Sequence, residues 1–256
     1  MEMRKIALVV EYEGTRYHGS QIQDNVPTIQ GEIERALTRI TGEGIRVAFA
    51  SRTDVGVHAR GQVVAFCTGS RLPPQTFITA LNHYLPQDIA VSRALRVRAD
   101  FDARRDALSR EYCYNLLNAV TRSPLLRRSA YFVPMPLDVE AMNRACQALI
   151  GTKDFAPFAS SVNGGRSTVR TVYRAEVVRE GHLVTFHLVA NSFLPHQVRN
   201  TIGALLKVGL GKNDVETFCQ IARSKMPGVA GPTLSPHGLC LIKVNYPDDG
   251  ALDENL

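Results

Sequence analysis

A single carboxylate among cationic and polar side chains stands out in the stretch AFASRTDVGVHARGQVVAF, residues 48–66. The carboxylate is Asp54, and its polar neighbours are Arg52, His58, Arg60 and Gln62. A nearby guanidinium favours the ionised form of a carboxylate, which can then act as a nucleophile or a general base. Gly56 can adopt a left-handed backbone angle that closes a tight turn. The stretch predicts a catalytic carboxylate in a constrained turn, although a bare D-x-G also fits a residue that only closes the turn.

Two further stretches carry side chains that could take part in chemistry. In NSFLPHQVRNTIGALLKVG, residues 191–209, the apolar spacing predicts a helix with Arg199 near its start. In SREYCY, Tyr112 and Tyr114 share one face of a predicted strand. Each has a plain structural alternative, because Arg199 also fits a solvated helix surface and the tyrosines also fit a core. The functional interpretation places Arg199 in a cleft and an exposed Tyr112 ring against a nucleobase.

The sequence lacks the motifs of several other kinds of site. The five cysteines are widely spaced and form no C-x-x-C pair, so free thiols are expected and a structural zinc site is not. Asp54 and His58 have no second cluster of metal-ligand residues beside them. No phosphate-binding glycine motif and no G-x-S-x-G elbow occurs. We therefore predict no metal and no cofactor.

Composition predicts a globular protein with a polyanionic partner. The chain has 256 residues, 45% of them hydrophobic, and a formal net charge of +6. The tail after Tyr246 carries four acidic residues and no basic ones, so the rest of the chain is more basic still. Phosphate backbones are the commonest polyanions that basic proteins bind. With no apolar run of about 18 residues and no signal peptide, we expect no membrane span and a cytoplasmic location.

Apolar periodicity predicts two similar series of elements. The first has strands at 4–12, 45–50, 61–67 and 89–98, with helices from 28 to 42 and from 74 to 85. The second has strands at 110–117, 168–179, 183–190 and 238–246, with helices at 138–150, 195–208 and 214–224. Both series follow the β-α-β-β-α-β order of ferredoxin-like folds.

The predicted fold class is α+β, with two ferredoxin-like halves whose antiparallel sheets meet around a central catalytic cleft. The predicted N-terminal half, residues 1–105, carries the catalytic Asp54, and residues 106–247 form the half that completes the cleft. Residues 248–256 are predicted to be a disordered acidic tail.

The chain resembles the TruA family of tRNA pseudouridine synthases over nearly its whole length. The resemblance lies in SRTDVGVHARGQV, FDARRDALSREYCY, FLPHQVRNTIGALL and GPTLSPHGLCLIKVNY, which occur in the family's order. Ser51 stands where the family usually has glycine. The resemblance implies isomerisation of uridine to pseudouridine at positions 38, 39 and 40 of the tRNA anticodon stem-loop, without cofactor or metal. It also implies a homodimer that binds tRNA across both subunits.

The resemblance assigns roles to the residues singled out above. Asp54 acts on the sugar, either by attack at C1′ or as a base at C2′, Arg199 pairs with it, and Tyr112 stacks on the flipped-out base and can take part in the final proton transfer. The expected substrate-binding residues are Arg52, His58, Arg60, Gln62, Tyr112, Arg104 and Arg110. Further candidates for phosphate contacts are Arg105, Arg166 and Arg170. A competing class is a non-catalytic RNA-binding protein, which does not explain a carboxylate among arginines in a cleft that attracts phosphate. Another is a metal-dependent nuclease, which predicts dependence on divalent ions and cleavage of the strand.

Overall fold

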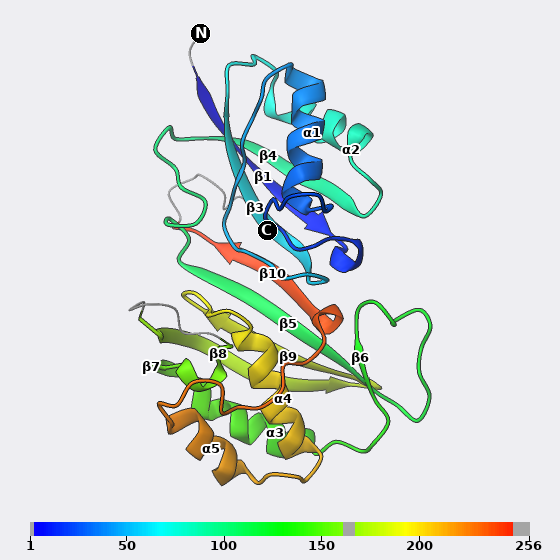
Figure 1. Cartoon of the computed structure of the whole chain (residues 1–256), viewed down its shortest axis with the longest axis vertical. Helices are drawn as coiled ribbons and strands as arrows, with labels where there is room; N and C mark the ends of the chain where they lie inside the picture. Colours follow the sequence, from blue (N-terminus) through cyan, green and yellow to red (C-terminus); the bar gives the residue numbers. More distant parts are fainter. Residues whose placement is uncertain (1–2, 161–166, 248–256) are drawn as a thin grey trace. The chain divides into compact units, whose positions relative to one another are not determined.

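The structure is a computed structural model that describes residues 3–160 and 167–247. Its elements form two compact units: the described residues of the first are 3–110 and 241–247, and those of the second are 111–160 and 167–240 (Figure 1). The chain therefore divides between residues 110 and 111, whereas the sequence placed the division between 105 and 106. The last strand, predicted in the C-terminal half, falls mostly in the first unit. The predicted disorder of residues 248–256 concerns a segment outside the described residues.

The first unit is a sheet with two helices. Its elements are β1 (Arg4–Tyr12), η1 (Gly14–Arg16), α1 (Ile29–Thr41), β2 (Ala48–Phe49), β3 (His58–Thr68), α2 (Pro74–Tyr84), β4 (Ile89–Val97) and most of β10 (Leu239–Asn245). The strand order is β4-β1-β3-β10, and the short β2 pairs with β3. Helices α1 and α2 contact each other, and α2 packs on β4 (Figure 1).

Helix α1 begins and ends where the sequence predicts. The hydroxyl of Thr28 accepts a hydrogen bond from the Gly31 N–H at 3.2 Å and caps the first turn. At the other end, Gly42 has a φ of 73°, the left-handed conformation that ends many helices. Between them, Ile33 and Leu37 are fully buried on the apolar face. This buried face holds α1 in the core of the first unit.

Strands β1 and β3 form the centre of the first unit's core. Residues 6–10 of β1 and 63–66 of β3 are buried apolar residues, so both faces of this pair are covered. The antiparallel register of β1 with β3 shifts between Val10 and Tyr12, and Tyr12 lies opposite Ala59. Such irregularities locally bend a strand and re-aim side chains. Here the shift sets the position of Tyr12 beside the turn that carries Asp54.

The second unit contains five strands and three α-helices in the residues that the structure describes. Its elements are β5 (Ser109–Asn118, apart from the first two residues), β6 (Tyr131–Val133), α3 (Val139–Cys146), η2 (Gln147–Leu149), β7 (Gly151–Asp154), η3 (Ala156–Phe158), β8 (Val169–Glu180), β9 (Leu183–Ala190), α4 (Gln197–Gly209), α5 (Val215–Arg223) and η4 (Pro236–Gly238). The strand order is β5-β9-β8-β7, and β6 runs parallel to β5. Helix α3 packs on β8 and contacts both α4 and α5.

Most predicted elements are confirmed, and the differences are local. The predicted strand at 45–50 is reduced to the two residues of β2, and the predicted strand at 61–67 begins three residues earlier, at His58. The predicted helix at 138–150 ends at Cys146 and continues as the 3-10 turn η2. Within residues 3–160 and 167–247, no helix has the length and hydropathy needed to span a bilayer. The chain is thus a mixed α and β protein with five α-helices in the described residues.

Candidate functional site

Asp54 lies in a tight turn between β2 and β3. The Val57 N–H donates to the Asp54 carbonyl oxygen at 3.1 Å, which closes the turn. Gly56 has a φ of 77°, a conformation that side-chain-bearing residues rarely adopt. The predicted role of Gly56 is therefore confirmed. The closing bond uses the backbone of Asp54, and the Asp54 side chain is half-buried.

The residue before Asp54 is held from three directions. The Thr53 N–H donates to the Ser20 hydroxyl at 2.9 Å, and the Ser20 N–H donates to the Thr53 carbonyl at 3.0 Å. The hydroxyls of Tyr12 and Thr53 are hydrogen-bonded at 2.8 Å. All three side chains are buried. This network fixes the backbone from which the Asp54 carboxylate projects, as a reacting group requires.

Two glycines let the segment before α1 pack directly against the turn. A Cβ atom on Gly19, whose φ is 90°, would lie 2.8 Å from the Thr53 carbonyl oxygen. A Cβ on Gly14 would lie 2.0 Å from the Val57 carbonyl oxygen. Sequence reasoning missed these positions, although the paired glycines in EGTRYHGS were a signal for close backbone approach. The segment therefore supports the turn through its backbone.

Two predicted substrate-binding residues are buried supports of the turn. Gln62 is 0% exposed, and its amide donates to the Ser51 carbonyl at 2.8 Å and accepts from the Ser51 N–H at 3.1 Å. It also donates to the Tyr12 hydroxyl at 3.2 Å. The Nδ1 atom of the buried His58 accepts from the Gly14 N–H at 3.0 Å. Both side chains direct polar atoms at the protein itself, so we reassign them from substrate contact to positioning.

Arg110 is a third predicted substrate-binding residue that the structure buries. Its guanidinium donates to the carbonyl oxygens of Ala50, Ala107 and Arg104 at 3.1, 3.1 and 2.6 Å. The side chain therefore ties residues 104–107 to the start of the charged turn, and we reassign it from phosphate contact to support. In contrast, Arg52, Arg60 and Arg104 are exposed and remain suited to phosphate. Of the further candidates, Arg105 is exposed, Arg170 is half-buried, and Arg166 lies outside the described residues.

In the second unit, Tyr112 packs edge-on against Phe193. The ring centroids are 5.1 Å apart and the planes meet at 84°. The Tyr112 side chain is buried at 6% exposure, so the exposed ring of the functional interpretation is not found and the burial matches the alternative of a core aromatic. Two residues along β5, the hydroxyl of Tyr114 donates to the Ser235 carbonyl at 2.8 Å. Burial raises the pKa of the Tyr114 phenol, and the nearby charge of Arg199 acts in the opposite direction.

Arg199 lies in the first turn of α4. The residue preceding the helix, His196, has a φ of 59° and its Nδ1 is hydrogen-bonded to the Ser160 hydroxyl at 2.7 Å. The Arg199 side chain is half-buried, and its Nε donates to the Leu234 carbonyl at 2.7 Å. This contact fixes the plane of the guanidinium. The plain alternative of a solvated helix arginine is therefore wrong.

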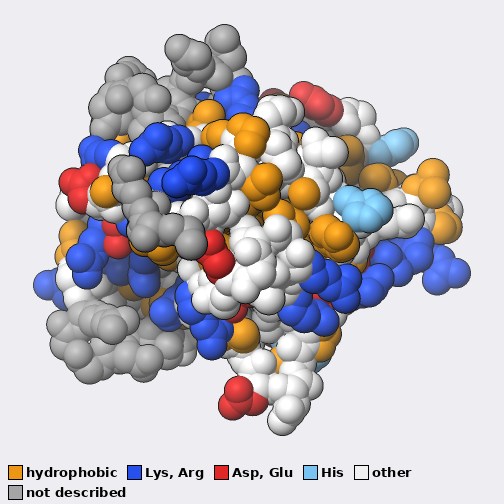
Figure 2. Space-filling model, turned by 90° about the horizontal axis from the view of Figure 1, so that it is seen from above, with side chains coloured by type: hydrophobic (Ala, Val, Ile, Leu, Met, Phe, Trp, Pro, Cys, Tyr) orange, Lys and Arg blue, Asp and Glu red, His pale blue; other side chains and the backbone are white. Residues whose placement is uncertain are grey.

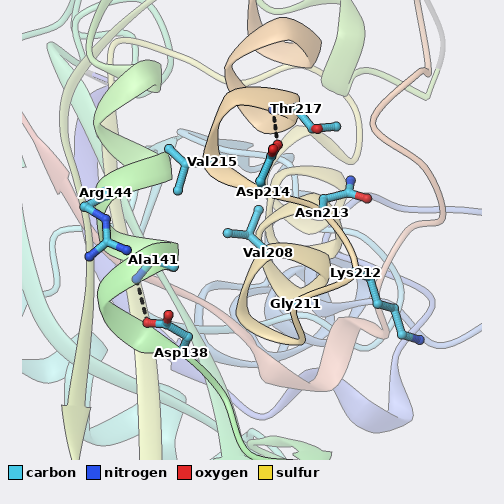
Figure 3. A pocket seen from close by; sticks show the side chains of 10 residues that line it. All are labelled: Asp138, Ala141, Arg144, Val208, Gly211, Lys212, Asn213, Asp214, Val215 and Thr217. Atoms are coloured by element: carbon cyan, nitrogen blue, oxygen red, sulfur yellow. Dashed lines mark hydrogen bonds between the residues drawn. The ribbon is translucent and has the colours of Figure 1, made fainter.

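A pocket in the second unit lies among the ends of α3, α4 and α5 (Figure 3). It encloses about 560 Å³, and its charged lining residues are Asp138, Arg144, Lys212 and Asp214. Both carboxylates cap helices: Asp138 accepts from the Ala141 N–H and Asp214 from the Thr217 N–H. The Thr217 hydroxyl and N–H together lower the pKa of Asp214. The carboxylates therefore serve the helices, and the pocket offers no reactive group.

Metal-ligand side chains do not gather anywhere in residues 3–160 and 167–247. No group of three or more His, Cys, Asp or Glu residues is arranged there to hold an ion. None of the described cysteines forms a disulfide, and burial raises the pKa of the Cys146 thiol to about 12, so this thiol stays protonated.

Comparison with known sequences identifies the family. The sequence profile of the tRNA pseudouridine synthase family matches residues 8–106 and 145–247. The chain belongs to this family. It is 46% identical to the tRNA pseudouridine synthase A of Roseiflexus castenholzii, over 97% of this chain and 93% of the relative. It is 42% identical to the protein of the same name from Acetivibrio thermocellus, over 95% of this chain and 100% of the relative.

Membership of the tRNA pseudouridine synthase family makes the chain an isomerase. The profile match includes Asp54 and Arg199 but not residues 107–144, which hold Tyr112.

Among solved structures, a chain of a Cbf5-Nop10-Gar1 complex is 14% identical, with a TM-score of 0.35 over 92% of this chain and 57% of that one. Figure 2 shows Lys and Arg side chains in several groups on the face seen from above. A basic surface suits an enzyme with a nucleic-acid substrate.

Proposed function

We propose that this chain converts uridine to pseudouridine at positions 38, 39 and 40 of the tRNA anticodon stem-loop, with Asp54 as the nucleophile or base. The observation that carries the proposal is the turn that holds Asp54. Its backbone is fixed by the hydrogen bonds among Thr53, Ser20 and Tyr12 and by the closing bond to the Asp54 carbonyl. Such preorganisation of a single carboxylate is what attack on a bound nucleoside needs.

The reaction breaks the N1–C1′ bond, turns the uracil, joins C5 to C1′ and moves the C5 proton to N1. No atom and no electron enters or leaves, so the protein has to supply only a carboxylate, a base-sized pocket and a route for one proton. We place this pocket in a cleft between two ferredoxin-like halves, with Arg199 paired to Asp54. Since the Arg199 Nε already donates to Leu234, pairing with a carboxylate uses the two Nη nitrogens.

In this proposal the target uridine is flipped out of the stem and stacks on Tyr112. Flipping costs a few kcal/mol of lost pairing and stacking, and one aromatic platform returns about 1–3 kcal/mol. The edge-on contact with Phe193 fixes the Tyr112 ring, which therefore loses little entropy when a base stacks on it. Because this ring is only 6% exposed, stacking requires that the flipped base displace the groups that cover it. Phosphate contacts from exposed arginines supply the rest. We also propose a homodimer and a cytoplasmic location, as the resemblance and the composition predicted.

The test is incubation of the purified protein with unmodified transcripts of tRNAs that carry uridine at positions 38, 39 or 40. We expect pseudouridine at each of these positions, without added metal or cofactor, and no product when the uridine at that position is replaced by cytidine. Pseudouridine at other tRNA positions alone would contradict the assignment to the anticodon stem-loop. Cleaved RNA without pseudouridine would favour the nuclease class instead.

Exposed arginines predict binding to tRNA that weakens with salt. Arg104→Gln should lower affinity and reduce the slope of log K against log salt by about 1, because one phosphate contact is lost. The matched control is Arg35→Gln on α1, whose guanidinium is ion-paired with Glu32 in the same helix. Filter binding between about 50 and 200 mM salt measures both slopes. Equal slopes for the unaltered protein and Arg104→Gln would remove Arg104 from the tRNA contact.

A further inference from the structure

A ten-residue segment of the second unit, residues 226–235, lies along α4 and is hereafter called the strap. It is anchored to η3 by backbone bonds from Gly228 to the Ala156 carbonyl at 3.3 Å and from Ala230 to the Pro157 carbonyl at 3.2 Å. A Cβ on Gly203 of α4 would lie 2.6 Å from the Pro232 carbonyl oxygen. The strap therefore approaches the helix so closely that only glycine fits at position 203.

The four residues that end the strap each meet a different group. Pro232 lies against Gly203, Thr233 donates to the Asn200 amide oxygen at 2.6 Å, and Leu234 accepts from the Arg199 Nε at 2.7 Å. Ser235 accepts from the Tyr114 hydroxyl at 2.8 Å. The carbonyl that orients Arg199 thus follows directly on the residue held by Asn200.

Asn200 connects three segments of the second unit through one side chain. It is 3% exposed, and its amide nitrogen donates to the Phe158 carbonyl at 2.8 Å and to the Ser160 hydroxyl at 3.3 Å. Its amide oxygen accepts from Thr233. A buried amide with both ends used is rigid and costly to disturb. No part of the proposed chemistry uses Asn200 directly, so these contacts call for another explanation.

We propose that Asn200 is a positioning residue for Arg199, acting through Thr233 and the Leu234 carbonyl. Asn200 fixes Thr233, Thr233 fixes the following peptide, and that peptide sets the plane of the guanidinium. The inference rests on the proposed function of Arg199. It extends that function, because the strap holds the orientation of the Arg199 guanidinium. If the guanidinium rotated, its two Nη donors would no longer align with the carboxylate oxygens.

Thr233→Val tests the inference, because it removes the hydroxyl and keeps the shape of the side chain. We expect the backbone amides of residues 233–235 to exchange with solvent at least about 10-fold faster, since their local opening becomes easier. We expect kcat for pseudouridine formation to fall about 10-fold with KM within about 2-fold, since a small misplacement of a reacting group slows chemistry more than binding. Asn200→Ser is the second variant and should act in the same direction.

The matched control is Thr185→Val, which removes another threonine hydroxyl that donates to an asparagine, here Asn115 at 3.2 Å. It should leave both the exchange of the strap and kcat unchanged. In an Arg199→Lys background, Thr233→Val should cost no further activity, because the Nε contact is already gone. The inference would be overturned if Thr233→Val lowered activity by the same factor in the Arg199→Lys background as in the unaltered protein. It would also be overturned if amide exchange of the strap were unchanged in Thr233→Val. Failure of the unaltered protein to form pseudouridine would instead overturn the proposed function.

Discussion

Asp54→Asn should abolish pseudouridine formation while tRNA binding remains. An amide is neither a nucleophile towards C1′ nor a base towards C2′, so turnover should fall by at least about 10⁴-fold. The turn itself should survive, because its closing bond uses the Asp54 carbonyl and asparagine suits tight turns. Removal of one negative charge also lessens repulsion of the phosphate backbone. Single-turnover assays on a tRNA transcript, with filter binding in parallel, measure the two effects separately.

A matched carboxylate control separates the chemistry of Asp54 from its charge. Asp214 caps α5 through the Thr217 N–H, and asparagine is an equally good cap, so Asp214→Asn should keep full activity and stability. Turnover by Asp54→Asn within about 10-fold of the unaltered protein would exclude Asp54 as the reacting carboxylate. Deuterium at C2′ of the target uridine then distinguishes the two possible roles of Asp54. It slows the reaction if Asp54 removes the C2′ hydrogen, and it has little effect if Asp54 attacks C1′ directly.

The long periodic elements could be predicted from the sequence because each buries one continuous apolar stripe. Helix α1 shows this, with Thr28 and Gly42 marking its ends and Ile33 and Leu37 its buried face. Strands β6 and β7 were missed, because runs of three and four residues are too short to show a period. The placement of most of β10 in the first unit was also missed. The order of elements along a chain does not say with which unit the last strand packs.

Part of the candidate site could be predicted from residue types, and the rest is visible only in the structure. Residue type and spacing indicated the Asp54 turn and the need for Gly56. They could not separate Gln62 and Arg110, which are buried supports, from Arg52 and Arg60, which are exposed, because residue type does not show which polar side chains face the protein interior. The contact between Asn200 and Thr233 joins residues 33 positions apart. No local pattern predicts a bond of that kind.

Arg199→Ala should lower kcat by about 10²–10³-fold and change KM little, since the guanidinium is proposed to orient a reacting group rather than to bind tRNA. Arg199→Lys should recover only part of the loss, because an ammonium keeps the charge but has neither the planar pair of Nη donors nor the Nε that bonds Leu234. The matched control is Arg223→Gln on α5, an exposed arginine beside Glu216, which should keep full turnover. Thermal unfolding of each variant shows whether the fold is intact.

Chemical rescue provides the sharpest test of Arg199. Guanidinium ion added at millimolar concentration, too low to unfold the protein, should restore part of the activity of Arg199→Ala, because the ion can occupy the space left by the side chain and pair with the carboxylate. It should do nothing for Asp54→Asn, in which the partner is missing. If Arg199→Ala turned over within about 3-fold of the unaltered protein, or if guanidinium restored both variants alike, the pairing of Arg199 with Asp54 would have to be abandoned. Rescue of Arg199→Ala alone would show that the planar cation, and not the methylene chain that carries it, is what the carboxylate requires.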